Sequence, residues 1–325
     1  MGFQFTRTVG AGLLSLLLAG PAAAAPDFGA WLAALKAEAR AQGISDKTIE
    51  AAFAGTAPIP RVIELDRRQP EGTITFAQYL ERVINDRRVR QGRELYAKHR
   101  TVLEAVGRRF GVQPRFIVAL WGIETDFGRN MGGFRVVDAL ATLAHDGRRS
   151  AYFRQELLAA LRILEEGHIA PDRMRGSWAG AMGQSQFMPS SFLRYATDFD
   201  GDGRRDIWST QADVFASAAN YLSTVGWNPD QTWGREVRLP AGFDTGVAGL
   251  QARMPLAEWQ KLGVRRVDGG PLPTALFQAS LILPDGPKGR AFLVYDNYRT
   301  IMDWNRSTYF ATAVGLLSDR IGAVE

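Results

Sequence analysis

The stretch QPRFIVALWGIETDFG, residues 113–128, decides the fold. Pro114 suits the first position of a helix, because its φ is already fixed and its missing N–H has no helical partner there. Gly128 suits the residue at which such a helix ends. Large apolar side chains recur at helical spacing between the two, at Phe116, Leu120, Ile123 and Phe127. The spacing predicts a helix with one continuous apolar side, which packs in the core.

Glu124 lies on the flank of this apolar side rather than on the face that meets water. At about 100° per residue it is in line with Ile117 and Trp121. Burial disfavours the charged form of a carboxyl group, so such a group keeps its proton to higher pH and can act as a general acid near neutral pH. The alternative is a carboxylate at a helix end that only borders the core, which is the commoner role of a single Glu. Asp126 points about 200° away from Glu124, so the helix offers one acid and not a pair.

Length and charge narrow the class of protein. At 325 residues the chain has room for one large domain or two to three smaller lobes. Its formal net charge is +5, and such a mildly cationic surface suits an anionic polymer. Nucleic acid and a cell-wall glycan with free carboxylates both qualify, but the sequence contains no RNA- or DNA-binding motif. We therefore expect no nucleic-acid partner.

The N-terminal residues predict a secretory signal peptide. Arg7 gives a positive start, residues 9–18 form an apolar run, and residues 22–25 are small, as at a cleavage site. The apolar run is too short to cross a membrane. The sequence has no cysteine, so it offers neither a disulfide nor a thiol for a lipid. These features predict a soluble periplasmic protein without a membrane anchor.

Helical patterns dominate the chain after this leader. Ser45 is placed to cap one helix and Thr75 precedes another, whereas the sequence APIP at residues 57–60 is expected to break the pattern. Residues 233–291 differ, because Pro and Gly are frequent there and short runs alternate as strands do. We expect a small β-rich lobe in that region and a return to helix in residues 307–321. The predicted fold class is mainly α, of the α+β type.

A second informative stretch is GSWAGAMGQSQFMPSS, residues 176–191. Its glycines and alanines favour a loop in which the backbone can approach a ligand closely. Gln184 and Gln186 supply donors and acceptors for sugar hydroxyl and acetamido groups. The side chains that offer apolar faces to a sugar ring are Trp178, Met182 and Phe187. A tight structural loop between two core helices explains the same residues equally well.

The third stretch, DFDGDGRRDIWS at residues 198–209, follows the pattern of an EF-hand calcium loop. Carboxylates at positions 1, 3 and 5 repel one another unless a hard cation neutralises them, and a backbone carbonyl is expected at position 7. The ligands predicted here are Asp198, Asp200, Asp202 and the carbonyl of Arg204. Ser209 replaces the usual Glu of position 12, and Asp213 is the expected late carboxylate. The alternatives are an acidic turn without metal and, for Asp213, a capping box with Thr210.

Arg148 and Arg149 follow a helix that is expected to end near residues 146–147. They suit either a cationic cap of that helix end or a clamp for a carboxylate. The three histidines lack the spacing of metal ligands or of a catalytic triad. The sequence contains no nucleophile elbow, zinc-protease motif or phosphate-binding loop.

Three motifs in this order and spacing resemble the lytic murein transglycosylase B family: WGIETDFGRNMGGFRVVDALATLAHDGRRSAYFRQEL, GSWAGAMGQSQFMPSSF and DFDGDGRRDIW. The resemblance implies a lysozyme-like helical core, flanked by a helical lobe and a small β-rich lobe. It divides the chain into a signal peptide at 1–25, a helical lobe at 26–112, a catalytic core with the EF-hand-like loop at 113–232, a β-rich lobe at 233–295, and a C-terminal helical segment at 296–325 that returns to the helical lobe.

The resemblance also implies an activity, the cleavage of the β-1,4 bond between N-acetylmuramic acid and N-acetylglucosamine in peptidoglycan, which leaves a 1,6-anhydro-muramyl end. Glu124 would be the single catalytic acid. The residues that would contact the glycan are Ser177, Gln186, Arg148, Arg149, Tyr221 and Asn305, beside the apolar faces of Met182 and Phe187. Trp304 stands where the family usually has Tyr, and this difference affects the neighbouring contact of Asn305. Calcium, held by Asp198, Asp200, Asp202, Arg204 and Asp213, would be structural, and no organic cofactor is implied.

The expected partner is the peptidoglycan strand, with cell-wall synthases or amidases as candidate companions, and the chain is expected to be a monomer. Three alternatives stay open at this point. A goose-type lysozyme would hydrolyse the same bond with water. An inactive glycan-binding scaffold would keep the fold without catalysis. A calcium sensor is disfavoured, because the single loop lacks the paired EF-hand that sensors have.

Overall fold

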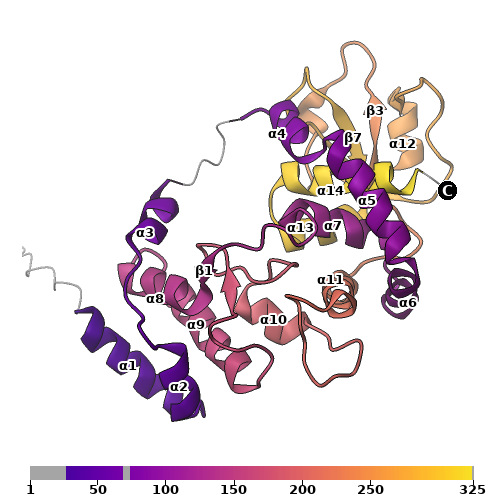
Figure 1. Cartoon of the computed structure of the whole chain (residues 1–325). Coiled ribbons are helices and arrows are strands. Elements are labelled where there is room, and N and C mark those ends of the chain that lie inside the picture. The colour runs from indigo at the N-terminus through magenta and orange to yellow at the C-terminus, as the bar shows by residue number, and fades with distance from the viewer. Residues whose placement is uncertain (1–26, 69–73, 324–325) are drawn as a thin grey trace, which may run out of the picture.

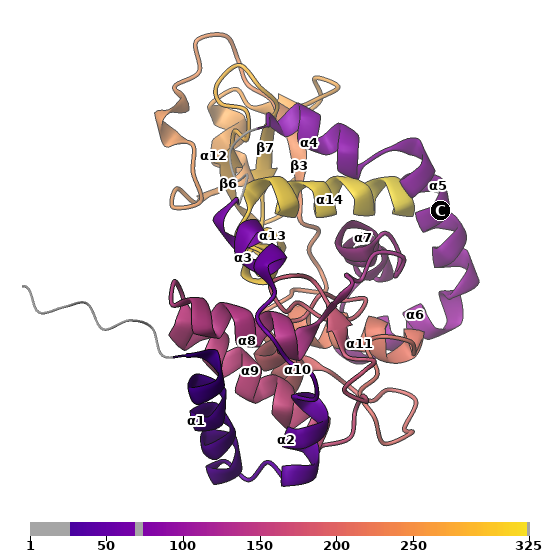
Figure 2. The same ribbon diagram turned by 60° about the vertical axis from the view of Figure 1, so that its left-hand side comes forward.

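The computed structural model describes residues 27–68 and 74–323, and the predicted signal peptide lies outside them. Helices form most of this part of the chain, and the strands gather largely in one region (Figures 1 and 2). The helices are α1 Phe28–Ala41, α2 Asp46–Ala52, α3 Pro60–Arg67, α4 Phe76–Val83, α5 Asp86–Lys98, α6 Arg100–Phe110, α7 Pro114–Thr125, α8 Val136–Asp146, α9 Ser150–Glu165, α10 Pro189–Tyr195, α11 Gln211–Thr224, α12 Leu256–Lys261, α13 Asp296–Trp304 and α14 Thr308–Gly322. The strands are β1 Phe134–Arg135, β2 Arg175–Gly176, β3 Gly234–Arg238, β4 Met254–Pro255, β5 Arg265–Arg266, β6 Gln278–Ile282 and β7 Ala291–Val294. The predicted class, mainly α with a small β-rich part, is confirmed.

Side-chain caps begin several helices where the sequence predicts them. The Ser45 hydroxyl accepts a hydrogen bond from the backbone N–H of Thr48, and Thr75 forms a capping box with Gln78. Each cap satisfies a backbone donor that the first helical turn leaves unpaired. The APIP sequence interrupts the helical pattern as expected, since residues 56–59 are not helical and separate α2 from α3. Pro60 is the first residue of α3, a position where the missing N–H of Pro costs nothing.

One hydrophobic core joins the first three helices to the pair α8 and α9. Its buried side chains include Leu35, Ile49 and Val62 from α1–α3, together with Leu140, Leu157, Leu161 and Phe192. Figures 1 and 2 both place α1 and α2 beside α8 and α9, at the end of the molecule remote from the sheet. The N-terminal helices therefore pack on this hairpin.

A second core surrounds α7. Residues 116–120 of this helix are all buried, and a helix that is buried on every side belongs in the middle of a fold. Side chains from α4–α6, α11, α13 and α14 enclose it, and α14 packs directly against it (Figure 2). Residues 26–112, predicted as one helical lobe, thus contribute α1–α3 to the first core and α4–α6 to the second.

An antiparallel sheet covers one side of this second core. Its strands lie in the order β4-β6-β7-β3-β5. Successive side chains of a strand point to opposite faces. Accordingly, Phe292 and Val294 of β7 belong to the core around α7, whereas Ala291 and Leu293 belong to a third, smaller core that includes Trp259 of α12. The strand-like runs predicted within residues 233–291 include β3, and β7 begins at the last residue of that range.

Candidate active site

The helix that carries Glu124 ends sooner than predicted. α7 stops at Thr125, and the chain leaves it through two non-glycine residues in left-handed conformation, Asp126 with φ 51° and Phe127 with φ 61°. Such residues are uncommon and cluster at functional sites. The prediction that Gly128 ends the helix was wrong. Gly128 serves a close approach instead, because a Cβ atom there would lie 2.4 Å from Oε1 of Gln184.

Asp126 is turned away from Glu124, as expected from the helical spacing. Its carboxylate accepts hydrogen bonds from Arg87 and Arg88 and pairs with Arg129. Burial alone would raise the pKa of Asp126, but the hydrogen bond from Arg87 and the surrounding positive charges outweigh it and lower the pKa. Asp126 is therefore a charged structural group that holds the end of α7 against α5.

Glu124 borders a small cavity of about 10 Å³, the size of roughly one water molecule. The lining residues are Ile117, Leu120, Trp121, Glu124, Gln184, Ser185, Val214, Phe215, Ala218 and Trp304, so Glu124 is the one carboxyl group among them. Burial raises the pKa of Glu124 to about 7, although a hydrogen bond from Trp304 acts in the opposite direction. At neutral pH the group can therefore both give and accept a proton.

The two oxygens of Glu124 have different surroundings. Nε1 of Trp304 donates a 2.7 Å hydrogen bond to Oε1. Among the described residues no hydrogen bond to Oε2 is found, so Oε2 is the oxygen that is free to exchange a proton with a substrate. The indole of Trp304 also contacts the rings of Phe187 and Tyr221, with ring centroids 5.2 and 4.9 Å away. These contacts fix the orientation of the donor.

Gln184 links α7 to the loop at residues 176–191. Its Oε1 accepts a hydrogen bond of 2.7 Å from Nε1 of Trp121, and its Nε2 donates to the carbonyl of Trp208. Its backbone carbonyl accepts from the hydroxyl of Thr125, the residue next to Glu124. All these contacts are internal, and Gln184 is buried. Gln184 thus positions the acid and does not present its amide to a sugar.

Ser185, next along this loop, is buried, and its hydroxyl has no hydrogen-bond partner in the structure. The residue lines the cavity beside Glu124. A buried hydroxyl without a partner is costly, so this group is a distinctive feature of the site. Sequence reasoning missed Ser185, since nothing in its spacing sets it apart from the other small residues of the loop.

The apolar side chains that were expected to carry sugar rings are part of the core. Met182 is 0% exposed and Phe187 is 3% exposed. Tyr221 and Trp304 lie against the ring of Phe187, so neither face of it is open to solvent. The expectation that Met182 and Phe187 stack on the glycan is therefore corrected: both support the site from behind.

Two polar residues of the loop hold its shape. The hydroxyl of Ser177 accepts hydrogen bonds from the backbone N–H groups of Ala179 and Ala181. Gln186 adopts a left-handed conformation with φ 49°, and its Nε2 donates to the carbonyls of Gly183 and Met131. The structural alternative for this loop thus has direct support, while the glycan contacts of Ser177 and Gln186 stay predictions.

Tyr221 and the end of α13 form one wall beside Glu124. The hydroxyl of Tyr221 donates to the carbonyl of Asp303, and its ring packs on Tyr195 and Trp304. Asn305 is exposed, and its Oδ1 accepts from the N–H of Ser307. Of the pair Trp304-Asn305, the structure brings Trp304 to the acid. The sequence signalled the pair, but the expectation was attached to Asn305.

Arg148 and Arg149 form a carboxylate clamp within the chain itself. Both guanidinium groups donate to the carboxylate of Asp66 in α3, which is 2% exposed. Burial alone would raise the pKa of Asp66, but the two arginine hydrogen bonds outweigh it and lower the pKa. The clamp predicted from the sequence exists, and its partner is internal; a contact of the two arginines with the glycan stays a prediction.

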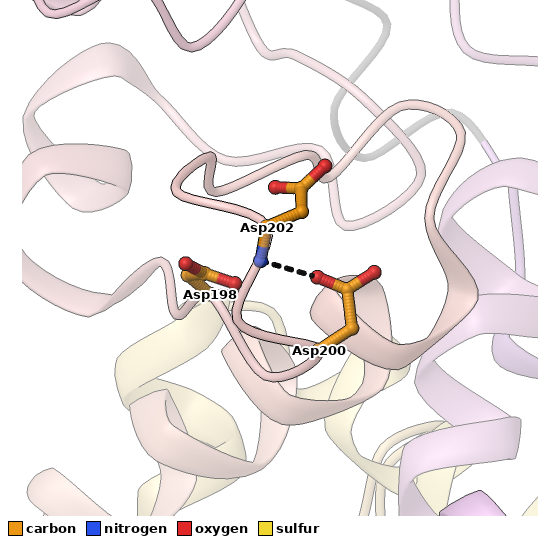
Figure 3. A group of neighbouring side chains, drawn as sticks. All are labelled: Asp198, Asp200 and Asp202. Carbon is orange, nitrogen blue, oxygen red and sulfur yellow. Dashed lines mark hydrogen bonds between the residues drawn. The ribbon is translucent and has the colours of Figure 1, made fainter.

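The acidic loop brings its three carboxylates together. Oxygens of Asp198, Asp200 and Asp202 lie within 4.8 Å of one another, and Figure 3 shows the side chains around the turn of the loop. Asp213 is 0% exposed, and its two oxygens accept from the backbone N–H groups of Phe199 and Asp206. The donor set consists of hard oxygens, which suits Ca²⁺. Thr210 makes no side-chain cap hydrogen bond, so the alternative capping box with Asp213 is not formed.

Comparison with known proteins identifies relatives of the whole architecture. Residues 27–319 match the family described as Transglycosylase SLT domain. The chain is 35% identical over 259 residues to membrane-bound lytic murein transglycosylase B of Escherichia coli, a match that spans 76% of this chain and 67% of that protein. No helix in the described ranges 27–68 and 74–323 has the length and apolar character needed to cross a membrane.

Solved structures give the same result in three dimensions. SltB3 from Pseudomonas aeruginosa in complex with NAG-anhNAM-pentapeptide superposes with a TM-score of 0.88 at 50% identity, over 90% of this chain and 79% of SltB3. The Escherichia coli lytic transglycosylase Slt35 in complex with calcium superposes with a TM-score of 0.76 at 29% identity, over 91% of this chain and 93% of Slt35.

Proposed function

The chain belongs to the family of Transglycosylase SLT domains, and on that premise we propose that Glu124 is the single acid and base of a peptidoglycan lytic transglycosylase. Its fold is lysozyme-like, as its structural relatives are. The enzyme is a lyase that cleaves the β-1,4 bond between N-acetylmuramic acid and N-acetylglucosamine and leaves a 1,6-anhydro-muramyl end. The observation that carries the assignment of Glu124 is a lone, partly buried carboxyl group with a pKa of about 7.

The proposed step conserves atoms and charge. Glu124 gives its proton from Oε2 to the glycosidic oxygen while the C1–O bond breaks, and the N-acetylglucosamine unit leaves as an alcohol. The C6 hydroxyl of the same muramyl residue attacks C1, and its proton passes to the Glu124 carboxylate. The C1–O6 bond replaces the broken bond, so no water is consumed. Attack within one sugar is favoured, because the nucleophile is held next to its target.

The absence of a second carboxyl group in the cavity lining favours the lyase over a lysozyme. A retaining or inverting hydrolase commonly uses a second acid, either as nucleophile or to activate water. Asp126 cannot take this role, because three arginines engage it on the other side of α7. Trp304, which holds Oε1, leaves the acid a single free oxygen for both proton transfers.

Mass spectrometry of the products tests this function. Purified sacculi are digested with the protein, and the muropeptides are weighed. Anhydro-muramyl ends, one water lighter than reducing ends, are expected throughout. Products with reducing ends would assign the protein to the hydrolases, and a protein that releases nothing would be a glycan-binding scaffold.

We propose further that the acidic loop binds one structural Ca²⁺ ion. Asp198, Asp200, Asp202 and Asp213 with the carbonyl of Arg204 would hold it, and the ion would offset the repulsion among the carboxylates. The structure of the relative Slt35 in complex with calcium supports this proposal. We also propose export to the periplasm through the signal sequence at 1–25, since peptidoglycan lies outside the cytoplasm.

A further inference from the structure

The acidic loop is tied to the rest of the fold at both ends. At its start the N–H of Thr197 donates to the hydroxyl of Ser217, and the N–H of Phe199 donates to the buried carboxylate of Asp213. At its end the N–H of Asp206 donates to Asp213 as well. The hydrogen bonds found for the backbone N–H groups of residues 201–204 join loop residues to one another. The part of the loop shown in Figure 3 therefore depends on its ends for its position.

His168, in the turn that follows α9, provides a further anchor at the end of the loop. Its Nδ1 lies 3.2 Å from the backbone nitrogen of Arg205, which donates a hydrogen bond to it. The side chain of His168 is 9% exposed and packs against the ring of Phe192 in α10, with ring centroids 5.5 Å apart. The imidazole is thus held against α10 while it bonds to the loop.

The surroundings of the imidazole decide which of its nitrogens carries the proton. Nε2 lies 3.2 Å from a carboxylate oxygen of Glu166, whereas Nδ1 faces the N–H of Arg205. A proton on Nε2 can be donated to Glu166 and leaves Nδ1 as the acceptor, so this tautomer satisfies both nitrogens. The guanidinium group of Arg205 also lies 3.0 Å from Nε2, but a protonated Nε2 cannot accept, and Nη2 of Arg205 donates to Glu166 instead. Burial and the charge of Arg205 lower the pKa of His168, so the ring is neutral near pH 7.

The hydrogen bond to His168 fixes the peptide unit between Arg204 and Arg205. The peptide bonds of the described residues are all trans, and in a trans peptide the N–H and the C=O lie in one plane and point to opposite sides. Because the N–H of Arg205 points at His168, the carbonyl of Arg204 points away from it. This carbonyl is the one backbone ligand expected for calcium, at position 7 of the loop. His168 therefore sets the direction of a ligand that it does not itself supply.

The end of the loop also supports the proposed catalytic acid. The carbonyls of Ile207 and Trp208 accept hydrogen bonds of 2.8 Å from the backbone N–H and the side-chain amide of Gln184. Gln184 in turn holds Trp121 and the residue next to Glu124. The position of the loop end therefore bears on the position of the acid.

We propose that His168 is a positioning residue of the calcium site, which fixes the peptide unit of the Arg204 carbonyl before the ion binds. The inference rests on the proposed calcium site, and it assigns to that site a residue outside the loop motif. A ligand that is already oriented loses less conformational freedom on binding, so the ion is bound more tightly. Hydrogen-bond partners that orient metal ligands in this way typically change the metal affinity by about 10- to 100-fold.

Calorimetric titration of the full chain with calcium chloride, after treatment with a chelator, tests the proposal. His168→Phe keeps a ring against Phe192 but has no acceptor. His168→Gln is a polar variant whose amide extends toward the position of Nε2, whereas the shorter side chain of His168→Asn keeps an oxygen near the position of Nδ1. The matched control is His145→Phe, which replaces a ring that packs against Phe28 and Trp31. Thermal unfolding verifies that all variants are folded.

Calcium is expected to bind about tenfold more weakly to His168→Phe and His168→Gln than to the wild type, and to bind His168→Asn within about threefold of the wild type. The control should bind calcium as the wild type does. Unchanged affinity in His168→Phe and His168→Gln, or an equal loss in all three His168 variants, would overturn the role of His168 and leave the calcium site standing. Failure of the wild type to bind calcium would overturn the site and this inference together. Product analysis on sacculi addresses the catalytic assignment separately from both.

Discussion

Trp304 donates a hydrogen bond of 2.7 Å from its indole Nε1 to Oε1 of Glu124, although 180 residues separate the two in the sequence. The bond joins the end of α13 to the last turn of α7. It stabilises the carboxylate more than the neutral acid, and so lowers the pKa that burial raises. The pKa of Glu124 therefore reflects two opposing effects: burial raises it, and the hydrogen bond from Trp304 lowers it.

Glu124→Gln is expected to lose at least about 100-fold in turnover, because Gln cannot transfer a proton. The free energy of unfolding of the Glu124→Gln variant should rise at the same time. Between pH 4.5 and about 7 the folded protein binds more protons at Glu124 than the unfolded chain does, so the free energy of unfolding falls as pH rises through this window. Gln does not ionise, and the variant should be about 3 kcal/mol more stable at pH 8 and equal near pH 4.5.

Urea unfolding at the two pH values measures this difference, and sacculus digestion measures the turnover. Glu104→Gln, which removes an exposed carboxylate paired with Arg100, is the matched control and should show neither effect. Turnover that survives in Glu124→Gln would remove Glu124 from the mechanism.

Trp304→Phe should move the pH dependence of catalysis. The acid form must protonate the leaving group, so kcat/KM of the wild type should fall as pH rises through about 7. Phe keeps the ring against Phe187 but has no N–H to stabilise the carboxylate, and the fall should then occur at higher pH. Trp259→Phe removes an indole hydrogen bond to Ala279 in the β-rich region and should leave the profile in place. An unshifted profile in Trp304→Phe would contradict the link.

Arg148→Gln with Arg149→Gln should destabilise the protein by about 2 kcal/mol, because it leaves the buried carboxylate of Asp66 without its charged partners. The pKa of Asp66 is held below 3.8 in the folded state, so this stabilisation is present above that pH and is lost as pH falls through the lower, folded value. Chemical unfolding at pH 7 and at pH 3 measures it.

Exposed arginines provide the control for this pair. Arg40 and Arg61 form surface ion pairs, and replacing both with Gln should change the stability by less than about 1 kcal/mol. The predicted glycan contact of the two arginines is measured separately: it should raise the KM for glycan in the Arg148 and Arg149 variant at a temperature where the variant is folded. An unchanged KM would confine the two arginines to their structural contact with Asp66.

Calcium should raise the melting temperature, and a chelator should lower it. An ion at 100 times its dissociation constant adds about 2.7 kcal/mol to the free energy of unfolding. Asp200→Asn should abolish the response, because it removes one of the three clustered carboxylates. Asp268→Asn, which removes an exposed aspartate paired with Arg266, should respond as the wild type does. If neither calcium nor a chelator changes the melting temperature, the loop has no calcium site.

Two buried serines should respond in opposite directions to replacement by Ala. Ser185→Ala removes a hydroxyl that has no partner and should raise the free energy of unfolding by about 1 kcal/mol. Ser217→Ala removes the acceptor for the backbone N–H of Thr197 and should lower it by a similar amount. Urea titrations give both values. A loss of stability in Ser185→Ala would show that its hydroxyl is satisfied in solution.

Local signals in the sequence predicted much of the fold. Caps such as Ser45 and Thr75 mark helix starts through contacts within a few residues, and β7 is a short unbroken run of apolar residues that is buried throughout. The break at residues 57–60 was predictable from its two prolines, and the second of them, Pro60, also suits the first position of α3. The end of α7 was misplaced, because Asp126 and Phe127 adopt left-handed conformations that are unfavourable by themselves and that the surrounding packing stabilises.

The sequence predicted those site residues that their own neighbours in the sequence make recognisable, and not the contacts that form only on folding. Glu124 could be found, since its helix is apolar around it. Its partner could not, because the hydrogen bond to Trp304 exists only after α13 has packed against α7. The same holds for Asp66, whose clamp by Arg148 spans 82 residues of sequence. Apolar loop residues such as Met182 look alike whether they face a ligand or a core, and burial decides between the two.

The long separation between Glu124 and Trp304 has a consequence for biosynthesis. A nascent chain that has reached Gly128 already contains the acid, but α13, which carries its hydrogen-bond donor Trp304, is synthesised much later. Until α13 has been made, Glu124 lacks this hydrogen bond. The order of synthesis therefore delays the assembly of the site until α13 is available to pack beside α7.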